Sequence, residues 1–149
     1  MAQNMFPMRI LAVSDSSEPA ALALRLAAEI ANATGSELHV VQVAMVSRYV
    51  YPDILSDQQV ERIRGEVEQK LDAEVARAET EGISIAGKHV AIGRSDAEVI
   101  KLAERLKVGL LVIGNRTEDA VRRILLGNDA ESIVRHAHCP VLVARTDDP

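Results

Sequence analysis

The hydrophobic pattern along the chain alternates between two rhythms. Short apolar runs without internal breakers are typical of parallel strands that are buried on both faces. Between these runs, apolar residues return every three or four positions, which is typical of amphipathic helices. The pattern predicts five strands, over residues 8–14, 38–43, 83–92, 108–113 and 140–145. It predicts four helices, from Ser17 to Ala33, Ser56 to about Gly82, Ser95 to about Lys107 and Asn128 to about His136.

The predicted helix boundaries carry capping signals. Ser17 followed by Pro19 is typical of a helix start, and Gly35 is typical of a helix end. At the three other starts a capping side chain stands three positions before a glutamine or glutamate: Ser56 before Gln59, Ser95 before Glu98, and Asn128 before Glu131. These signals predict a capping box for each of the two starts at serine.

Strands that alternate with helices indicate an α/β domain with a parallel sheet, helices on both faces and right-handed crossovers. The chain has 149 residues, about the length of one domain. We therefore predict a single Rossmann-like domain over 1–149, with 1–7 and 146–149 as flexible ends. In such sheets ligands bind at the carboxyl ends of the strands, where the strand order reverses.

Composition narrows the class of protein. No apolar stretch reaches the roughly 18–20 residues that a membrane-spanning helix needs, and the first residues lack the pattern of a signal peptide. A single cysteine, Cys139, fits a cytoplasmic location. A net charge of −5 with only three aromatic residues argues against nucleic-acid binding. His136, His138 and Cys139 lack the paired spacing of a structural zinc site, so we predict no metal there.

Two glycines frame the loop between the fourth strand and the last helix. Gly114 ends the apolar strand, and Gly127 stands just before the helix start at Asn128. A loop of this kind can approach phosphate groups through its backbone N–H groups. The alternative is that the glycines only shape the loop. Asp15, at the end of the first strand, is either a ligand-facing residue or a turn former.

This loop resembles the signature of the universal stress protein family, which reads Gly, two residues, Gly, nine residues, Gly, then Ser or Thr. Gly114 and Gly127 take the first and third glycine positions. Thr117 replaces the second glycine, and Asn128 replaces the Ser or Thr. The resemblance covers nearly the whole chain, and its ending from Glu131 to Val143 is highly characteristic. It implies the strand order 3-2-1-4-5, the adenine nucleotide alpha-hydrolase-like arrangement.

The resemblance also implies a nucleotide site with ATP as ligand. By this analogy Asp15 meets the ribose or adenine end, and the backbone around Val41 reads the adenine edge. The residues expected near the phosphates are Gly114, Arg116, Thr117, Gly127, Asn128 and Asp129. The carboxylates close to this loop disfavour a polyphosphate unless Mg²⁺ bridges them, so Mg²⁺ is expected only together with ATP.

The function implied is that of a stress-response protein which acts by binding and association. In the family the fifth strand pairs across a two-fold axis, so Val141, Leu142 and Val143 are the expected homodimer contact. We predict a nucleotide-binding or nucleotide-sensing homodimer that is not an enzyme and carries an incomplete ATP motif. Two alternatives stay open, a dimeric interaction protein that binds no nucleotide and a weak Mg²⁺-dependent ATPase.

Overall fold

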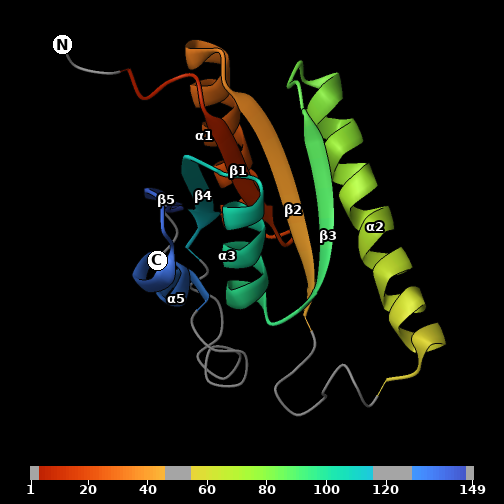
Figure 1. Cartoon of the computed structure of the whole chain (residues 1–149). Coiled ribbons are helices and arrows are strands. Elements are labelled where there is room, and N and C mark those ends of the chain that lie inside the picture. Colours follow the sequence, from red (N-terminus) through yellow and green to blue (C-terminus); the bar gives the residue numbers. More distant parts are fainter. Residues whose placement is uncertain (1–3, 46–54, 116–128, 147–149) are drawn as a thin grey trace.

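The computed structural model describes residues 4–45, 55–115 and 129–146. The strands are β1 (Arg9–Ser14), β2 (Glu37–Met45), β3 (Gly87–Gly93), β4 (Leu110–Gly114) and β5 (Val141–Ala144). The described helices are α1 (Glu18–Thr34), α2 (Asp57–Thr80), α3 (Ser95–Arg105) and α5 (Asp129–His136). The strands form one five-stranded sheet in the order β3-β2-β1-β4-β5, and every neighbouring pair is parallel (Figure 1). The predicted fold class and strand order are confirmed.

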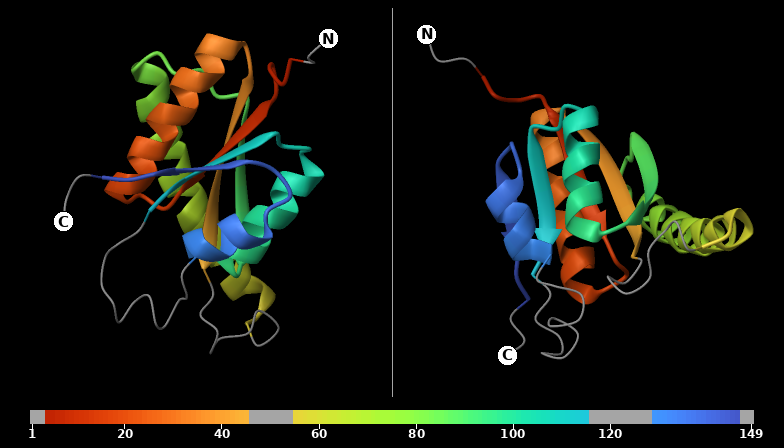
Figure 2. Two further views of the ribbon diagram at one scale, coloured as in Figure 1. Left: turned by 90° about the vertical axis from the view of Figure 1, so that its left-hand side faces the viewer. Right: turned by 60° about the horizontal axis from the view of Figure 1, so that its bottom comes forward.

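Helices cover both faces of the sheet (Figure 2). Ile10 and Ala12 of β1 belong to a core cluster with α1 and α2, whereas Leu11 belongs to a second cluster with α3 and α5. All three side chains are essentially inaccessible to solvent. Because successive side chains of a strand point to opposite faces, a strand covered on both faces must be apolar at nearly every position. This explains the unbroken apolar runs of the sequence.

Three of the predicted helix boundaries form as expected. The Ser17 hydroxyl accepts a hydrogen bond of 3.3 Å from the backbone amide of Ala20. Gly35 ends α1 in the left-handed conformation, with φ of 70°. At the start of α2, Ser56 and Gln59 complete a capping box through bonds of 3.1 and 2.8 Å. These local signals are confirmed because they depend only on residues within one turn of each other.

The predicted capping box at Ser95 is wrong. Ser95 is already the first residue of α3, and the capping position belongs to Arg94, which makes no side-chain capping bond. The reason lies in tertiary packing, because the first turn is organised around the buried carboxylate of Asp96. That carboxylate accepts a hydrogen bond of 2.8 Å from Nε of Arg94, the residue at the capping position.

Two strands begin later than the apolar runs suggest. The run predicted over 83–92 enters the sheet only at Gly87, because the Ile83 amide donates to the Ala78 carbonyl and still closes α2. The run predicted over 108–113 enters at Leu110, because the Val108 amide donates in the same way to Ala103 at the end of α3. An apolar residue can thus close a helix instead of starting a strand.

The predicted flexible ends lie partly outside the described residues, namely 1–3 and 147–149. Residues 4–7 and 146 belong to no helix or strand, and Met5 is exposed. Within the described part of the chain, no helix combines the length and the apolar character needed to cross a membrane.

Candidate functional site

The sheet reverses its strand order at the boundary between β1 and β4. From β1 the sheet continues through β2 to β3 on one side, and through β4 to β5 on the other. The carboxyl ends of all strands lie at one edge, the lower edge in Figure 1. Ser14 and Gly114, the last residues of β1 and β4, therefore frame the place where ligands bind in open α/β sheets.

Asp15 lies directly after β1 at this edge and is exposed. Its Oδ1 accepts a hydrogen bond of 2.9 Å from the backbone amide of Ser17. The next residue, Ser16, takes a left-handed conformation with φ of 65°, which is uncommon for a residue with a side chain. Asp15 therefore stabilises the tight turn into α1 at the carboxyl end of β1.

Gly114 is required by close packing between β4 and α1. A Cβ atom at this position would lie 2.5 Å from the carbonyl carbon of Pro19 and 2.7 Å from the backbone nitrogen of Ala20. Backbone atoms cannot withdraw as a flexible side chain can. The glycine thus brings the first turn of α1 against the end of β4, which shapes this edge whether or not a nucleotide binds.

Val41, around which the adenine edge is expected to be read, lies inside the sheet. Val41 is fully buried and lies within the ladder, in register with Val13 of β1 and His89 of β3. Pairing with β1 ends at Gln42, yet β2 continues to Met45 along β3. The backbone of β2 that extends beyond the end of β1 is therefore residues 43–45, two to four positions after Val41.

Alternation along β2 identifies which of these residues faces the β1 side. The Glu37 amide donates to the Met8 carbonyl just before β1, and the Leu38 carbonyl accepts from Ala86 just before β3. Because backbone groups of successive strand residues point to opposite sides, the odd-numbered residues of β2 face β1. Val43 is the first such residue beyond the end of the β1 ladder.

A polar cluster lies at the same end of the sheet, on the face covered by α2. Ser14 and Gln42 are in register, 3% and 6% exposed, and Ser14 Oγ donates a short hydrogen bond to a carboxylate oxygen of Glu74 in α2. The Gln42 Oε1 atom is buried, and no residue in the described part of the chain forms a hydrogen bond with it. The sequence pattern did not predict this cluster. Its only signal was a polar residue near the carboxyl end of each of two mostly apolar strands.

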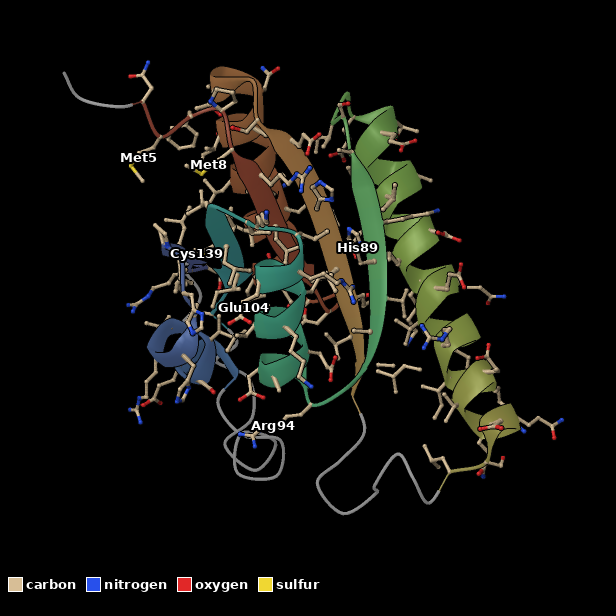
Figure 3. The ribbon with its side chains drawn as sticks, viewed as in Figure 1. Met5, Met8, His89, Arg94, Glu104 and Cys139 are labelled. Carbon is tan, nitrogen blue, oxygen red and sulfur yellow. The ribbon has the colours of Figure 1, made fainter. Side chains whose placement is uncertain are left out.

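A second buried polar group joins α3 to α5. Asp96 is 5% exposed and accepts a 2.6 Å hydrogen bond from Ser132 of α5 in addition to the bond from Arg94. Burial opposes ionisation, but the hydrogen bonds from Ser132 and the Ala97 amide and the charge of Arg94 outweigh it, so the pKa of Asp96 lies below its ordinary value. Figure 3 shows Arg94 at the lower end of α3.

The remaining predicted site residues lie mostly outside the described part of the chain. They are Arg116, Thr117, Gly127 and Asn128. Asp129 is the first residue of α5, and its side chain is also outside the description. The structure therefore brings together Asp15, Gly114 and the end of β2, and the expected phosphate contacts of the other residues stay predictions.

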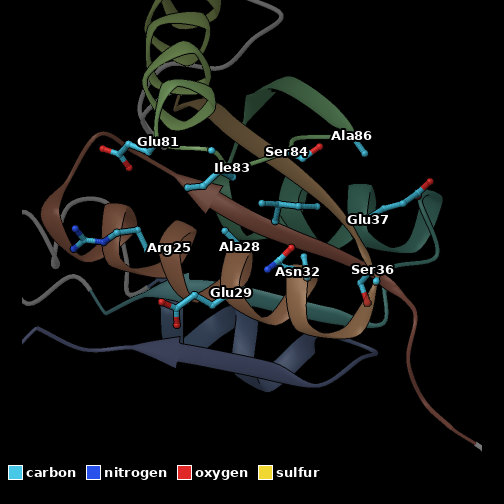
Figure 4. A pocket seen from close by; sticks show the side chains of 14 residues that line it. Arg25, Ala28, Glu29, Asn32, Ser36, Glu37, Glu81, Ile83, Ser84 and Ala86 are labelled. Atoms are coloured by element: carbon cyan, nitrogen blue, oxygen red, sulfur yellow. The ribbon is translucent and has the colours of Figure 1, made fainter.

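A groove of about 670 Å³ lies at the opposite end of the sheet (Figure 4). Arg25, Glu29 and Asn32 of α1 line one wall, and the segment from Glu81 to Ala86 that precedes β3 lines the other. Because it lies at the amino ends of β2 and β3, it is separate from the edge that carries Asp15 and Gly114.

Cys139 and the histidines near it lack the features of a reactive or metal-binding centre. Burial raises the pKa of the Cys139 thiol, which favours the protonated form. The Nδ1 atom of His138 lies 2.7 Å from a carboxylate oxygen of Glu104, and both side chains are exposed. Among the described residues, no group of three or more His, Cys, Asp or Glu side chains is arranged to hold a metal ion.

A family model described as "Universal stress protein family" matches residues 7–145 of this sequence. The chain belongs to that family. A universal stress protein of Methanocaldococcus jannaschii is 30% identical over 145 residues, which cover 96% of this chain and 84% of the relative. The resemblance inferred from the glycine motif and the characteristic ending is therefore confirmed.

Solved structures of universal stress proteins share the fold. The universal stress protein UspA from Lactobacillus plantarum superposes with a TM-score of 0.74 at 25% identity, over 93% of this chain and 97% of that one. A universal stress protein from Archaeoglobus fulgidus in complex with dAMP has a TM-score of 0.64 at 22% identity, over 95% of this chain and 99% of that one.

Proposed function

We propose that this family member binds an adenine nucleotide across the carboxyl edge of β4, β1 and β2 and acts in the stress response as a homodimer. The observation that carries the proposal is the order of groups along this edge. Gly114 ends β4, Asp15 follows β1, and β2 continues past the end of β1 from Val43 onward. Phosphates, ribose and base of one nucleotide would meet these three positions in turn.

The chemistry of each position suits the part of the ligand assigned to it. The carboxylate of Asp15 can accept hydrogen bonds from ribose hydroxyls. The backbone C=O of Val43 faces the β1 side after the last register pair, Ser14 with Gln42, and can accept a hydrogen bond from an amino group on a base edge. The A. fulgidus relative that binds dAMP has the same fold, which supports an adenine nucleotide as the ligand class.

The incomplete motif is expected to weaken ATP binding. Thr117 places a β-branched side chain where the family signature has a glycine, which hinders a close approach of the backbone to phosphate. Asn128 offers an amide donor where the signature has a hydroxyl. We propose that Mg²⁺ binds only together with ATP.

Calorimetric titration with ATP and Mg²⁺ tests the proposal. We expect a dissociation constant in the micromolar range, on the order of −7 to −8 kcal/mol, and a loss of at least about tenfold in Asp15→Ala because a charge-assisted hydrogen bond is removed. Glu79→Ala is the matched control, since it removes an exposed carboxylate near the far end of α2. Failure of the native protein to bind, with binding restored in Thr117→Gly, would assign the chain to nucleotide-free dimers instead.

We propose that the protein acts by binding rather than by turnover. Phosphoryl transfer needs a positioned nucleophile and several cationic groups around the phosphates. Phosphate release that depends on Mg²⁺ and disappears in Asp15→Ala would reverse this assignment in favour of an ATPase. The role in stress and the cytoplasmic location stay predictions.

The proposed dimer forms through the free edge of β5. Among the described residues, β5 pairs with β4 alone and forms one lateral edge of the sheet. The carbonyl groups of Pro140 and Ala144 accept hydrogen bonds from β4 and the residue after it, so the even-numbered residues face β4. The backbone groups of Val141 and Val143 therefore face outward, where a second copy of the strand can pair with them.

A further inference from the structure

We infer that the cluster of Ser14, Gln42 and Glu74 reads the six-position of a bound purine and favours the amino group of adenine over a carbonyl group. This inference rests on the proposed function, because it names the base selectivity of the same site. It is carried by one buried amide oxygen, Gln42 Oε1, with which no described residue forms a hydrogen bond.

The three side chains converge on one face of the sheet. Ser14 and Gln42 are register partners on adjacent parallel strands, so their side chains leave the sheet next to each other on the same face. Leu38 and Val40, which alternate with Gln42 on that face, belong to the core under α1 and α2. Glu74 reaches down from α2 and accepts the hydrogen bond of the Ser14 hydroxyl.

Gln42 is costly to the protein in the absence of a ligand. Its side chain is 6% exposed, and its Oε1 atom is buried without a hydrogen-bond partner among the described residues. Burying a polar atom unpaired forfeits its hydration without compensation. A leucine or valine at this position would continue the apolar pattern of β2. A polar group kept at such a place is explained if a ligand supplies the missing donor.

The cluster offers mainly acceptors. Gln42 contributes its free Oε1, and Glu74, which is half-buried, contributes a carboxylate that already accepts from Ser14. An exocyclic amino group carries two N–H donors and matches this set. A carbonyl at the same position of hypoxanthine or guanine would face acceptors with its own lone pairs. A site built around unpaired polar groups rejects the analogue that cannot pair with them.

The position of the cluster agrees with the path proposed for the nucleotide. Ser14 directly precedes Asp15, the residue assigned to the ribose, and Gln42 directly precedes Val43, the residue assigned to the base. A base that lies over the end of β2 would thus have the cluster beneath it, toward α2. An ordered water could also donate to Gln42, but a water would not by itself distinguish one purine from another.

Parallel titrations with ATP and ITP test the inference, since ITP replaces the 6-amino group by a carbonyl. We expect the native protein to bind ATP about tenfold or more tightly than ITP. In Gln42→Leu we expect this ratio to fall to within about twofold, mainly through weaker ATP binding. Gln69→Leu, which changes an exposed glutamine of α2, should keep the native ratio.

The outcomes separate this inference from the proposed function. Two results would overturn the inferred recognition of the base and leave nucleotide binding intact. One is equal binding of ATP and ITP by the native protein, and the other is a preference for ATP that survives in Gln42→Leu. Binding of neither nucleotide by the native protein would overturn both. A thermal midpoint at or above the native one shows that Gln42→Leu is folded. If that variant does not fold, Gln42→Met repeats the test with a more adaptable side chain.

Discussion

At the scale of single residues, Gly114 shows how a motif position can have a packing role. A methyl group there would collide with backbone atoms of Pro19 and Ala20 at less than 3 Å. The same residue ends β4 beside the proposed phosphate site. The absence of a side chain therefore allows β4 and α1 to pack closely. It also leaves space at the carboxyl end of β4.

We predict that Gly114→Ala lowers the free energy of unfolding by about 1–3 kcal/mol, because the added carbon overpacks a contact between backbones. Gly65→Ala is the matched control. Gly65 lies inside α2, and a methyl group there would have no atom within 4 Å, so alanine should raise stability by about 0.5–1 kcal/mol. Urea denaturation of both variants measures the difference. Equal stability of Gly114→Ala and the native protein would refute the packing argument.

His39 of β2 and His89 of β3 form a stacked pair of rings. Their ring nitrogens Nδ1 and Nε2 are 3.1 Å apart, and the rings stack with centroids 5.4 Å apart. Burial, together with the charges of His39 and Arg105, lowers the pKa of His89 below its ordinary value of 6.5 (His89 is labelled in Figure 3). The folded protein thus resists protonation of His89 more than the unfolded chain does.

We predict that this pair makes stability depend on pH. Because the unfolded chain binds the proton first, the free energy of unfolding should be fully retained above about pH 6.5 and should fall as the pH drops below it. His89→Gln should flatten this slope in thermal unfolding between about pH 7.5 and 5.5. His138→Gln removes an exposed histidine and should keep the native slope. An unchanged slope in His89→Gln would contradict the assignment.

At the scale of elements, a buried carboxylate links the start of α3 to the first turn of α5. Asp96 at the start of α3 accepts hydrogen bonds from Arg94 and from Ser132. Ser132 lies in the first turn of α5, which begins directly after the last position of the glycine motif. The buried carboxylate therefore anchors one end of the proposed phosphate loop.

We predict that Asp96→Ala lowers the free energy of unfolding by about 2–3 kcal/mol at neutral pH, because charge-assisted hydrogen bonds are lost. It should also increase amide hydrogen exchange in α5 and weaken ATP binding. Since the pKa of Asp96 is lowered, its stabilisation is present above the ordinary value of 3.8 and is lost as the pH falls below it, so the difference from native should shrink in acid.

Glu104→Gln is the control for this experiment. It removes an exposed ion pair with His138, and exposed pairs contribute at most about 1 kcal/mol. It should therefore leave exchange in α5 and ATP binding near native values. Native-like exchange in α5 of Asp96→Ala would show that other contacts hold this helix in place.

At the scale of the whole molecule, the two outer strands of the sheet, β3 and β5, have different surroundings. α2 packs against β2 and β3 at one edge. At the other edge, Val141, Leu142 and Val143 of β5 are half-buried by the helices packed behind them. An apolar edge strand with outward backbone groups favours pairing with another strand, which is the geometric basis of the proposed dimer.

We predict that Val143→Pro yields a monomer in sedimentation at micromolar concentration. Proline removes the outward N–H of residue 143, while the inward carbonyl of Ala144 keeps its bond to Asn115. Val143→Thr retains the N–H and a β-branched side chain, and it should remain a dimer. A native protein that sediments as a monomer would refute the dimer, and a dimer in Val143→Pro would place the contact elsewhere.

The sequence by itself determined the features that act over a few residues. The capping of α1 by Ser17, the capping box of Ser56 and the end of α1 at Gly35 all depend on groups within one helical turn. The apolar runs located all five strands, because covered strands are apolar at nearly every position. The strand order and the place of the candidate site came from the resemblance to the family. The family model confirms that resemblance, and the sheet has the expected strand order.

The tertiary structure decided what depends on distant partners. Asp96 rather than Ser95 organises the start of α3, because Ser132, 36 positions away, donates to its carboxylate. Val43 rather than Val41 has backbone beyond the ladder, because β1 ends earlier than β2. The Oε1 atom of Gln42 lacks a partner among the described residues, while the hydroxyl of its register partner Ser14 donates to Glu74, 60 positions away. Such contacts arise only when helices fold onto the sheet, so periodicity and capping signals cannot encode them.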